Sequence, residues 1–119
     1  MAFYYPEVTD FVEMFGCESY IDDGVQISKF VDIKNREMVF SISNMQNSIS
    51  IYMYQDGTLC FSIYEEGAVS IIVDENLIII EYLNYQNLYA KKITIIETYP
   101  LFKIKHSTLI NKNMDELRQ

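Results

Sequence analysis

The sequence predicts a mainly β fold of the α+β kind: an antiparallel β-meander of about seven to eight strands with one N-terminal helix on its apolar face. Apolar residues recur with helical spacing only near the N-terminus, and from Val25 onward they alternate with polar residues as in half-buried strands. Turn signals separate these runs about every 10 residues, so consecutive strands should be antiparallel neighbours. We expect a single domain over residues 1–119, its sheet twisted or curled into a half-barrel.

An amphipathic helix is predicted at about residues 6–15. Its apolar stripe, spaced i, i+3, i+4 and i+7, consists of Val8, Phe11, Val12 and Phe15. Pro6 suits the first helical position because its missing N–H costs nothing there. Gly16 suits the left-handed position that ends many helices.

The meander is predicted over about residues 25–106, after an acidic loop from Cys17 to Gly24 and before an irregular tail at 107–119. The clearest hairpin signal is Asp56-Gly57, since both residues accept a positive φ. Further polar or charged turns are expected at 34–37, 44–47, 65–67, 74–76 and 84–87.

The two faces of the middle strands differ in composition. The side expected to face the core carries Met38, Phe40, Ile42, Ile49, Ile51, Met53, Leu59, Phe61 and Ile63. The opposite side carries Ser41, Ser43, Ser48, Ser50, Tyr52, Tyr54, Cys60, Ser62 and Tyr64. Ser and Tyr are typical of protein-binding surfaces, although the strand propensity of Tyr, or cover by a loop or a second subunit, explains the same pattern.

Charge is segregated along the chain, which has a formal net charge of −8. No Lys or Arg occurs between Arg36 and Lys91, and the acidic residues of that span fall mostly in predicted turns. Solubility explains any single charge, but a basic partner explains the whole pattern through electrostatic steering. The candidate partner-binding residues are Asp56, Glu65, Glu66, Asp74, Glu75, Tyr52, Tyr54 and Tyr64.

No catalytic motif accompanies these patterns, and we expect that the protein is not an enzyme. His106 is the only histidine, and no spacing of Ser and Asp around it supports a triad. Ligand clusters for zinc are missing, so no metal and no cofactor is expected. The acidic balance disfavours direct binding to nucleic acid or to an anionic membrane, because both require Lys and Arg opposite phosphate.

The compartment is predicted to be the cytoplasm. The N-terminus has neither a basic region nor a long apolar stretch, and no run approaches the length of a membrane helix. Cys17 and Cys60 are the only cysteines and are expected to be reduced thiols.

Taken over its whole length, the chain resembles the immunity proteins of bacterial contact-dependent growth inhibition and related polymorphic toxin systems. The resemblance consists of small size, an acidic balance, no export signal, a Tyr-bearing meander and no catalytic motif, together with a richness in Ile, Asn, Lys and Tyr that is similar to low-GC accessory genes. It includes no motif that carries a functional position over. It implies a monomer that binds one cognate toxin domain, often a basic nuclease, and neutralises it by steric and electrostatic occlusion.

Two other classes stay open at this point. A meander curled toward a barrel can act as a small-molecule carrier, with the core-side Phe and Ile lining its cavity. A nucleic-acid mimic or a structural oligomer subunit is a third class, although mimics usually carry denser charge than the 22% of charged residues found here.

Overall fold

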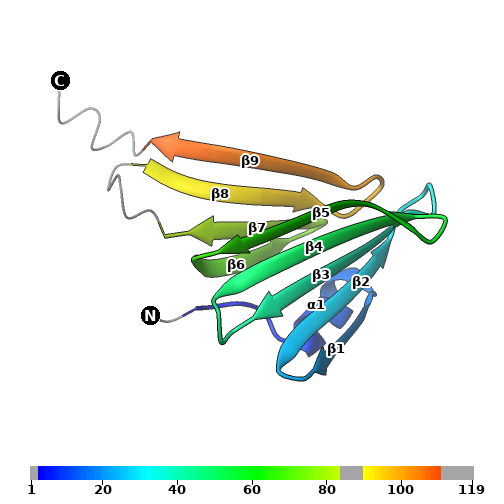
Figure 1. Cartoon of the computed structure of the whole chain (residues 1–119), viewed down its shortest axis with the longest axis horizontal. Coiled ribbons are helices and arrows are strands. Elements are labelled where there is room, and N and C mark those ends of the chain that lie inside the picture. The colour runs from blue at the N-terminus through cyan, green and yellow to red at the C-terminus, as the bar shows by residue number, and fades with distance from the viewer. Residues whose placement is uncertain (1–2, 84–89, 111–119) are drawn as a thin grey trace.

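A computed structural model describes residues 3–83 and 90–110 of the chain. These residues form one helix and two open antiparallel sheets (Figure 1). The five-stranded sheet has the order β1-β2-β3-β4-β5, and the four-stranded sheet has the order β6-β7-β8-β9. The predicted antiparallel meander with an N-terminal helix is therefore confirmed, but it is divided into two sheets.

The elements follow one another along the chain with short connections. The helix is α1 (Val8–Phe15). The first sheet contains β1 (Glu18–Asp22), β2 (Val25–Val31), β3 (Glu37–Ser43), β4 (Ser48–Gln55) and β5 (Thr58–Glu66). The second sheet contains β6 (Ala68–Asp74), β7 (Leu77–Tyr82), β8 (Ala90–Glu97) and β9 (Lys103–Ile110).

Gly67 is the point at which the chain leaves the first sheet for the second. Its φ of 81° is accessible to glycine at no steric cost. Beside it, Ala68 N donates to the carbonyl of Asn47 at 2.9 Å and Leu83 N donates to the carbonyl of Gly67 at 2.8 Å. The turn expected at 65–67 is thus a crossing between sheets, and Glu65 and Glu66 belong to strand β5 instead of a turn.

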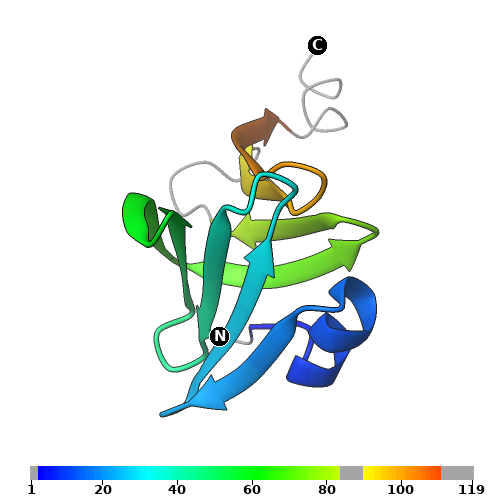
Figure 2. The same ribbon diagram turned by 90° about the vertical axis from the view of Figure 1, so that its right-hand side faces the viewer.

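The inner faces of the two sheets share one hydrophobic core. Its buried members come from the helix and from both sheets: Phe11, Phe30, Met38, Phe40, Ile42, Ile49, Ile51, Ala68, Ile71, Ile78, Ile80, Tyr82, Ile96 and Phe102. Figure 2 shows the sheets at an angle to one another with α1 beside them. Because a sheet buries only one face well, this packing leaves the outer face of the first sheet at the surface.

Helix α1 covers part of the inner face through Phe11, which is fully buried and lies 6.1 Å from the Phe40 ring centroid. The helix begins at Val8, two residues later than predicted, because Pro6 lies before the N-terminal cap. Val12, expected in the apolar stripe, is 43% exposed. Gly16 ends the helix with a φ of 64°, as predicted.

Strand β1 replaces the loop expected from Cys17 to Gly24. Glu18–Asp22 pairs with β2, and the connecting residues Asp23 and Gly24 both have positive φ. This is the geometry of a two-residue hairpin, for which Asp-Gly is a strong signal. An acidic strand is tolerated here because β1 is an edge strand with mostly exposed or half-buried side chains.

The register of the middle strands agrees with the predicted inward set, with two corrections. Met38 pairs with Met53 and Phe40 with Ile51, on the inner face. A β-bulge between Met53 and Tyr54 then places Leu59 opposite Tyr54, so Leu59 lies on the outer side and is 50% exposed. Phe61 keeps the inward phase opposite Met53 but is 43% exposed, because β5 is the last strand of its sheet.

The end of the meander also differs from the expectation. Strand β9 continues to Ile110, so residues 107–110 belong to a strand and not to an irregular tail. The remaining tail and the turn expected at 84–87 lie outside the described residues. Cys17 and Cys60 are free cysteines. Over residues 3–83 and 90–110, no helix is long and apolar enough to cross a membrane.

Candidate protein-binding surface

The outer face of β3, β4 and β5 is lined by hydroxyl-bearing side chains. We call it the Ser/Tyr face, and it comprises Ser41, Ser43, Ser48, Ser50, Tyr52, Ser62 and Tyr64. Direct cross-strand pairs build it: Ser41 with Ser50, Ser50 with Tyr64 and Tyr52 with Ser62. Cross-strand partners point to the same side of a sheet, so these hydroxyls form a continuous patch.

An open depression of about 440 Å³ is hollowed into this face. Its lining includes most of the Ser/Tyr face together with Met45 and Gln46 of the β3–β4 turn. Met45 is 94% exposed, so the rim of the depression carries a flexible apolar side chain. A depression bordered by Tyr, Met and hydroxyl groups can accept a side chain of another protein and satisfy its polar atoms.

Two of the three predicted tyrosines stand on the Ser/Tyr face. Tyr52 is 38% exposed and Tyr64 is 53% exposed. The Tyr64 hydroxyl lies 2.8 Å from Oε1 of Glu66 and 3.2 Å from Oε1 of Gln46. The hydrogen bond to Glu66 raises the pKa of Tyr64.

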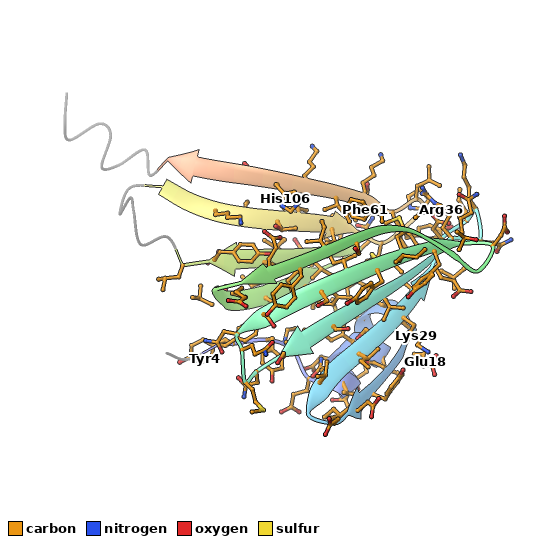
Figure 3. All side chains as sticks on the ribbon, viewed as in Figure 1. Tyr4, Glu18, Lys29, Arg36, Phe61 and His106 are labelled. Carbon is orange, nitrogen blue, oxygen red and sulfur yellow. The ribbon has the colours of Figure 1, made fainter. Side chains whose placement is uncertain are left out.

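Tyr54 lies farther along β4, where it pairs with Glu37 and with Leu59. It lines a second depression, of about 860 Å³, that also includes Cys17 and Lys29. Burial raises the pKa of the Cys17 thiol. Lys29 and Glu18 are opposite one another on β2 and β1, at the far edge of the sheet from β5 (Figure 3).

The predicted acidic residues do not form one cluster. Asp56 lies in the β4–β5 turn, Asp74 is the last residue of β6, and Glu75 lies in the β6–β7 turn. Strand β5 ends just before Gly67 and β6 begins just after it, so the start of β5 and the end of β6 both lie far from Gly67. Both of these turns are therefore at the end of the molecule opposite Glu65 and Glu66 (Figure 1). Residues that share the sequence pattern are therefore divided between two ends of the fold.

Glu65 differs from the other acidic residues predicted to bind the partner because it points inward. It pairs with Ile49 on the inner face, and its Oε2 lies 2.8 Å from Nζ of Lys92 on β8. Tyr82 on β7 donates to Oε1 at 2.9 Å, and Thr94 on β8 donates to the same atom at 3.2 Å. Glu65 is consequently an interior link between the sheets.

His106 on β9 (Figure 3) completes this group, with Nδ1 2.9 Å from the Thr94 hydroxyl and 3.8 Å from Oε1 of Glu65. We call this group of five residues the Glu65 cluster: Glu65, Tyr82, Lys92, Thr94 and His106. Burial raises the pKa of Glu65, but the hydrogen bonds from Lys92 and Tyr82 and the nearby positive charge outweigh burial, so the net pKa is lowered. Burial is the main cause that raises the pKa of Tyr82.

The Glu65 cluster was missed by sequence reasoning, which assigned Glu65 to a turn at 65–67. His106 is exposed, and only its contact with Thr94 and Glu65 was not foreseen. The signal for the cluster is the strand alternation itself: Phe61, Ile63 and Glu65 share one phase, so continuing the inward pattern places the carboxylate inside. The residues that receive it, on β7, β8 and β9, become neighbours only when the sheets pack. Within the described ranges, no three His, Cys, Asp or Glu side chains are grouped so that they could hold a metal ion.

Comparison with known proteins gives one sequence relative and one solved structure, and no protein-family model matches. The chain is 32% identical over 72 residues to the uncharacterized protein PM0492 of Pasteurella multocida (strain Pm70), which covers 60% of this chain and 69% of that protein. The structure is similar to a chain of a contact-dependent growth inhibition toxin–immunity protein complex from Klebsiella pneumoniae 342, with a TM-score of 0.72 and 18% identity over 90% of this chain and 97% of that chain. The resemblance inferred from sequence is thus confirmed at the level of the fold.

Proposed function

Since this chain belongs to the family of the Pasteurella multocida protein PM0492 and folds like a chain of a toxin–immunity complex, we propose that it is an immunity protein. It binds a cognate toxin domain and neutralises it by covering the surface with which the toxin acts on its target. The observation that carries this proposal is the shared fold, which extends over 90% of this chain and 97% of the other.

The Ser/Tyr face is the surface that we propose meets the toxin. Tyr side chains supply contact area at low conformational-entropy cost, and Ser hydroxyls adapt their hydrogen bonds to a partner. Tyr52 and Tyr64 are the proposed anchors, and the depression between them receives a side chain of the toxin. Tyr54 contributes at the far end of the same side. The mechanism is occlusion, without a chemical step by the immunity protein.

The acidic turns are proposed to steer a basic toxin toward this surface. Within residues 3–83 and 90–110, no cation forms an ion pair with Asp56, Asp74 or Glu75, whereas Arg36 is paired with Asp32. Glu66 is exposed and only accepts a hydrogen bond from Tyr64. Unpaired carboxylates on a chain of net charge −8 attract a basic protein over several ångströms.

A nuclease is the toxin activity that fits best with such a partner, because an enzyme that holds phosphate must present Lys and Arg. An acidic protein bound over that surface excludes the nucleic acid. We propose a one-to-one complex in the cytoplasm, where a nuclease toxin acts, and no enzymatic activity for this chain.

Co-expression with the toxin domain encoded beside this gene tests the proposal. Cells that carry both proteins should grow, cells with the toxin domain alone should not, and native mass spectrometry of the purified pair should give a one-to-one mass. The variant Tyr52→Ala/Tyr64→Ala should protect less well at equal expression. If the chain neither binds the domain nor restores growth, the proposal is wrong; a co-purified small molecule in place of a protein would favour a carrier.

A further inference from the structure

Strand β5 ends the first sheet with one side of its backbone unpaired. It pairs with β4 only, and no backbone hydrogen bond from elsewhere in the described part of the chain reaches its other side. Seven of its nine residues are exposed. We call this unpaired side of residues 58–64 the β5 edge.

The β5 edge lacks the charges that usually protect an exposed edge strand. Residues 58–64 carry no charge, and three large side chains along them are exposed: Leu59 at 50%, Phe61 at 43% (Figure 3) and Tyr64 at 53%. The bulge at Met53/Tyr54 disturbs pairing only near the start of the strand. From Phe61 onward the strand is regular and open to another strand.

The other sheet edges are protected by means that β5 lacks. Tyr4 covers β6, because its N–H donates to the carbonyl of Val69 at 3.1 Å and its carbonyl accepts from Ile71 at 2.8 Å. Strand β1 is five residues long and carries acidic residues at both ends. Strand β9 carries Lys103 and Lys105. The exposure of β5 is therefore particular to that strand.

Negative charges at the two ends of the β5 edge limit which strand can pair with it. Asp56 precedes the uncharged stretch, and Glu65 and Glu66 follow it. In an antiparallel pair of two β5 strands centred on Phe61, Asp56 of one copy would lie opposite Glu66 of the other. In a parallel pair, each carboxylate would lie beside its own counterpart. Like charges directly opposite one another destabilise strand pairs, so a second copy is disfavoured.

We propose that the β5 edge receives an extended strand of the toxin domain, with an uncharged centre and Lys or Arg at its ends. This inference rests on the proposed function. Main-chain hydrogen bonds to residues 58–64 contribute affinity, and the terminal cations of the toxin strand meet Asp56 and Glu66. Because Tyr64 and Ser62 belong both to β5 and to the Ser/Tyr face, the added strand extends that face into one continuous interface.

Hydrogen–deuterium exchange of the full chain, alone and with the toxin domain encoded beside its gene, tests the inference. Binding should slow exchange of those amides of residues 58–64 that point away from β4 at least tenfold, while the amides of β1, the other terminal strand of the first sheet, should keep their rates. The variant Ser62→Lys should raise the Kd at least tenfold, because a charge on an edge strand opposes pairing. Ile21→Lys, at an exposed position of β1, is the matched control and should change the Kd less than threefold. Unchanged melting temperatures establish that both variants fold.

The outcomes separate this inference from the function on which it rests. If the chain binds and neutralises the toxin but the amides of residues 58–64 are not protected from exchange, the proposal that the β5 edge receives a toxin strand is wrong, and the immunity function is unaffected. Absence of binding would overturn both. Protection of these amides in the isolated protein that rises with concentration, with a dimer in sedimentation, would show that a second copy is the occupant and that the toxin strand is not.

Discussion

The carboxylate of Glu65 lies 2.8 Å from Nζ of Lys92, so an ion pair joins the last strand of the first sheet to the second sheet. Tyr82 and Thr94 both donate to the other oxygen of the same carboxylate, Oε1. A half-buried carboxylate with several donors stabilises the fold most when all of them are present. The pair therefore fixes how β5, and with it the Ser/Tyr face, is held against β7 and β8.

Replacing Glu65 with Gln should lower the free energy of unfolding by about 1–3 kcal/mol, because the amide loses the charge that Lys92 faces. The neighbouring Glu66→Gln should change it by less than about 0.5 kcal/mol, since Glu66 is exposed. Urea unfolding of both variants measures the difference. Equal effects of the two substitutions would contradict the interior role of Glu65.

The stability of the protein should fall in acid. Asp32 is buried; burial raises its pKa, but hydrogen bonds from Arg36 and from the backbone of Phe102 and Lys34 outweigh burial, so the net pKa is lowered. The net pKa of Glu65 is lowered too. A lowered folded-state pKa contributes stability above the ordinary pKa of about 4, and this contribution is lost as the pH falls through the folded-state value.

Urea unfolding between about pH 7 and pH 3 measures this dependence. Asp32→Asn should lower the free energy of unfolding by about 3 kcal/mol at neutral pH, because it breaks a largely buried ion pair, and should flatten the acid dependence. The exposed Asp74→Asn is the control and should leave both nearly unchanged. If the free energy of unfolding of Asp32→Asn depends on pH as steeply as that of the unsubstituted protein, other carboxylates govern acid unfolding.

Phe11→Ala should lower the free energy of unfolding by about 3–5 kcal/mol, because it truncates a fully buried aromatic side chain beside Phe40. Met14→Ala removes a side chain from the exposed side of the same helix, where Met14 is 47% exposed, and should cost less than about 1 kcal/mol. Chemical denaturation checks both values. A loss below about 1 kcal/mol for Phe11→Ala would mean that α1 does not anchor the inner face.

Association with the toxin domain should be fast at low salt and slow markedly as salt rises, because exposed charges steer the encounter. Reversing Asp56, Glu66, Asp74 and Glu75 to Lys should slow association more than it speeds dissociation. Glu65 is kept unchanged in this set because its substitution would lower the stability of the protein. Stopped-flow binding at several salt concentrations gives both rates. If neither salt nor the four substitutions change the association rate, the electrostatic proposal is wrong and the acidic residues serve only solubility.

The tyrosines should act on the lifetime of the complex. Tyr52→Ala and Tyr64→Ala should each raise the dissociation rate, by about 2 kcal/mol or more in binding free energy if the side chain is a central anchor. Tyr4→Ala is a matched control, because Tyr4 is 72% exposed, pairs with Ser70 of β6 and does not line the depression in the Ser/Tyr face. Surface plasmon resonance separates the two rates. Dissociation rates unchanged at both positions would place the interface elsewhere on the chain.

Much of the local structure follows from the sequence. The apolar spacing of Phe11 and Phe15 gives the helix, and the alternation around Phe40 and Ile51 gives the strands, their faces and the outward direction of Tyr52. These features depend on residues close in the chain, whose periodicity reports directly which side is buried. Strand β1 was available to the same reasoning through Asp23-Gly24 and was missed because its acidic composition suggested a loop.

The partition into two sheets, the Glu65 cluster and the open β5 edge were decided only by the tertiary structure. A sequence such as Glu65-Glu66-Gly67 indicates only that the chain changes direction, whether the next strand pairs with the preceding one or crosses to another sheet. The choice depends on which faces bury most apolar surface together, and that involves residues such as Ile51 and Ile80, far apart in sequence. The sequence by itself therefore determined the elements and their faces, while long-range packing determined which residues meet the Glu65 carboxylate and which strand lies at an open edge of its sheet.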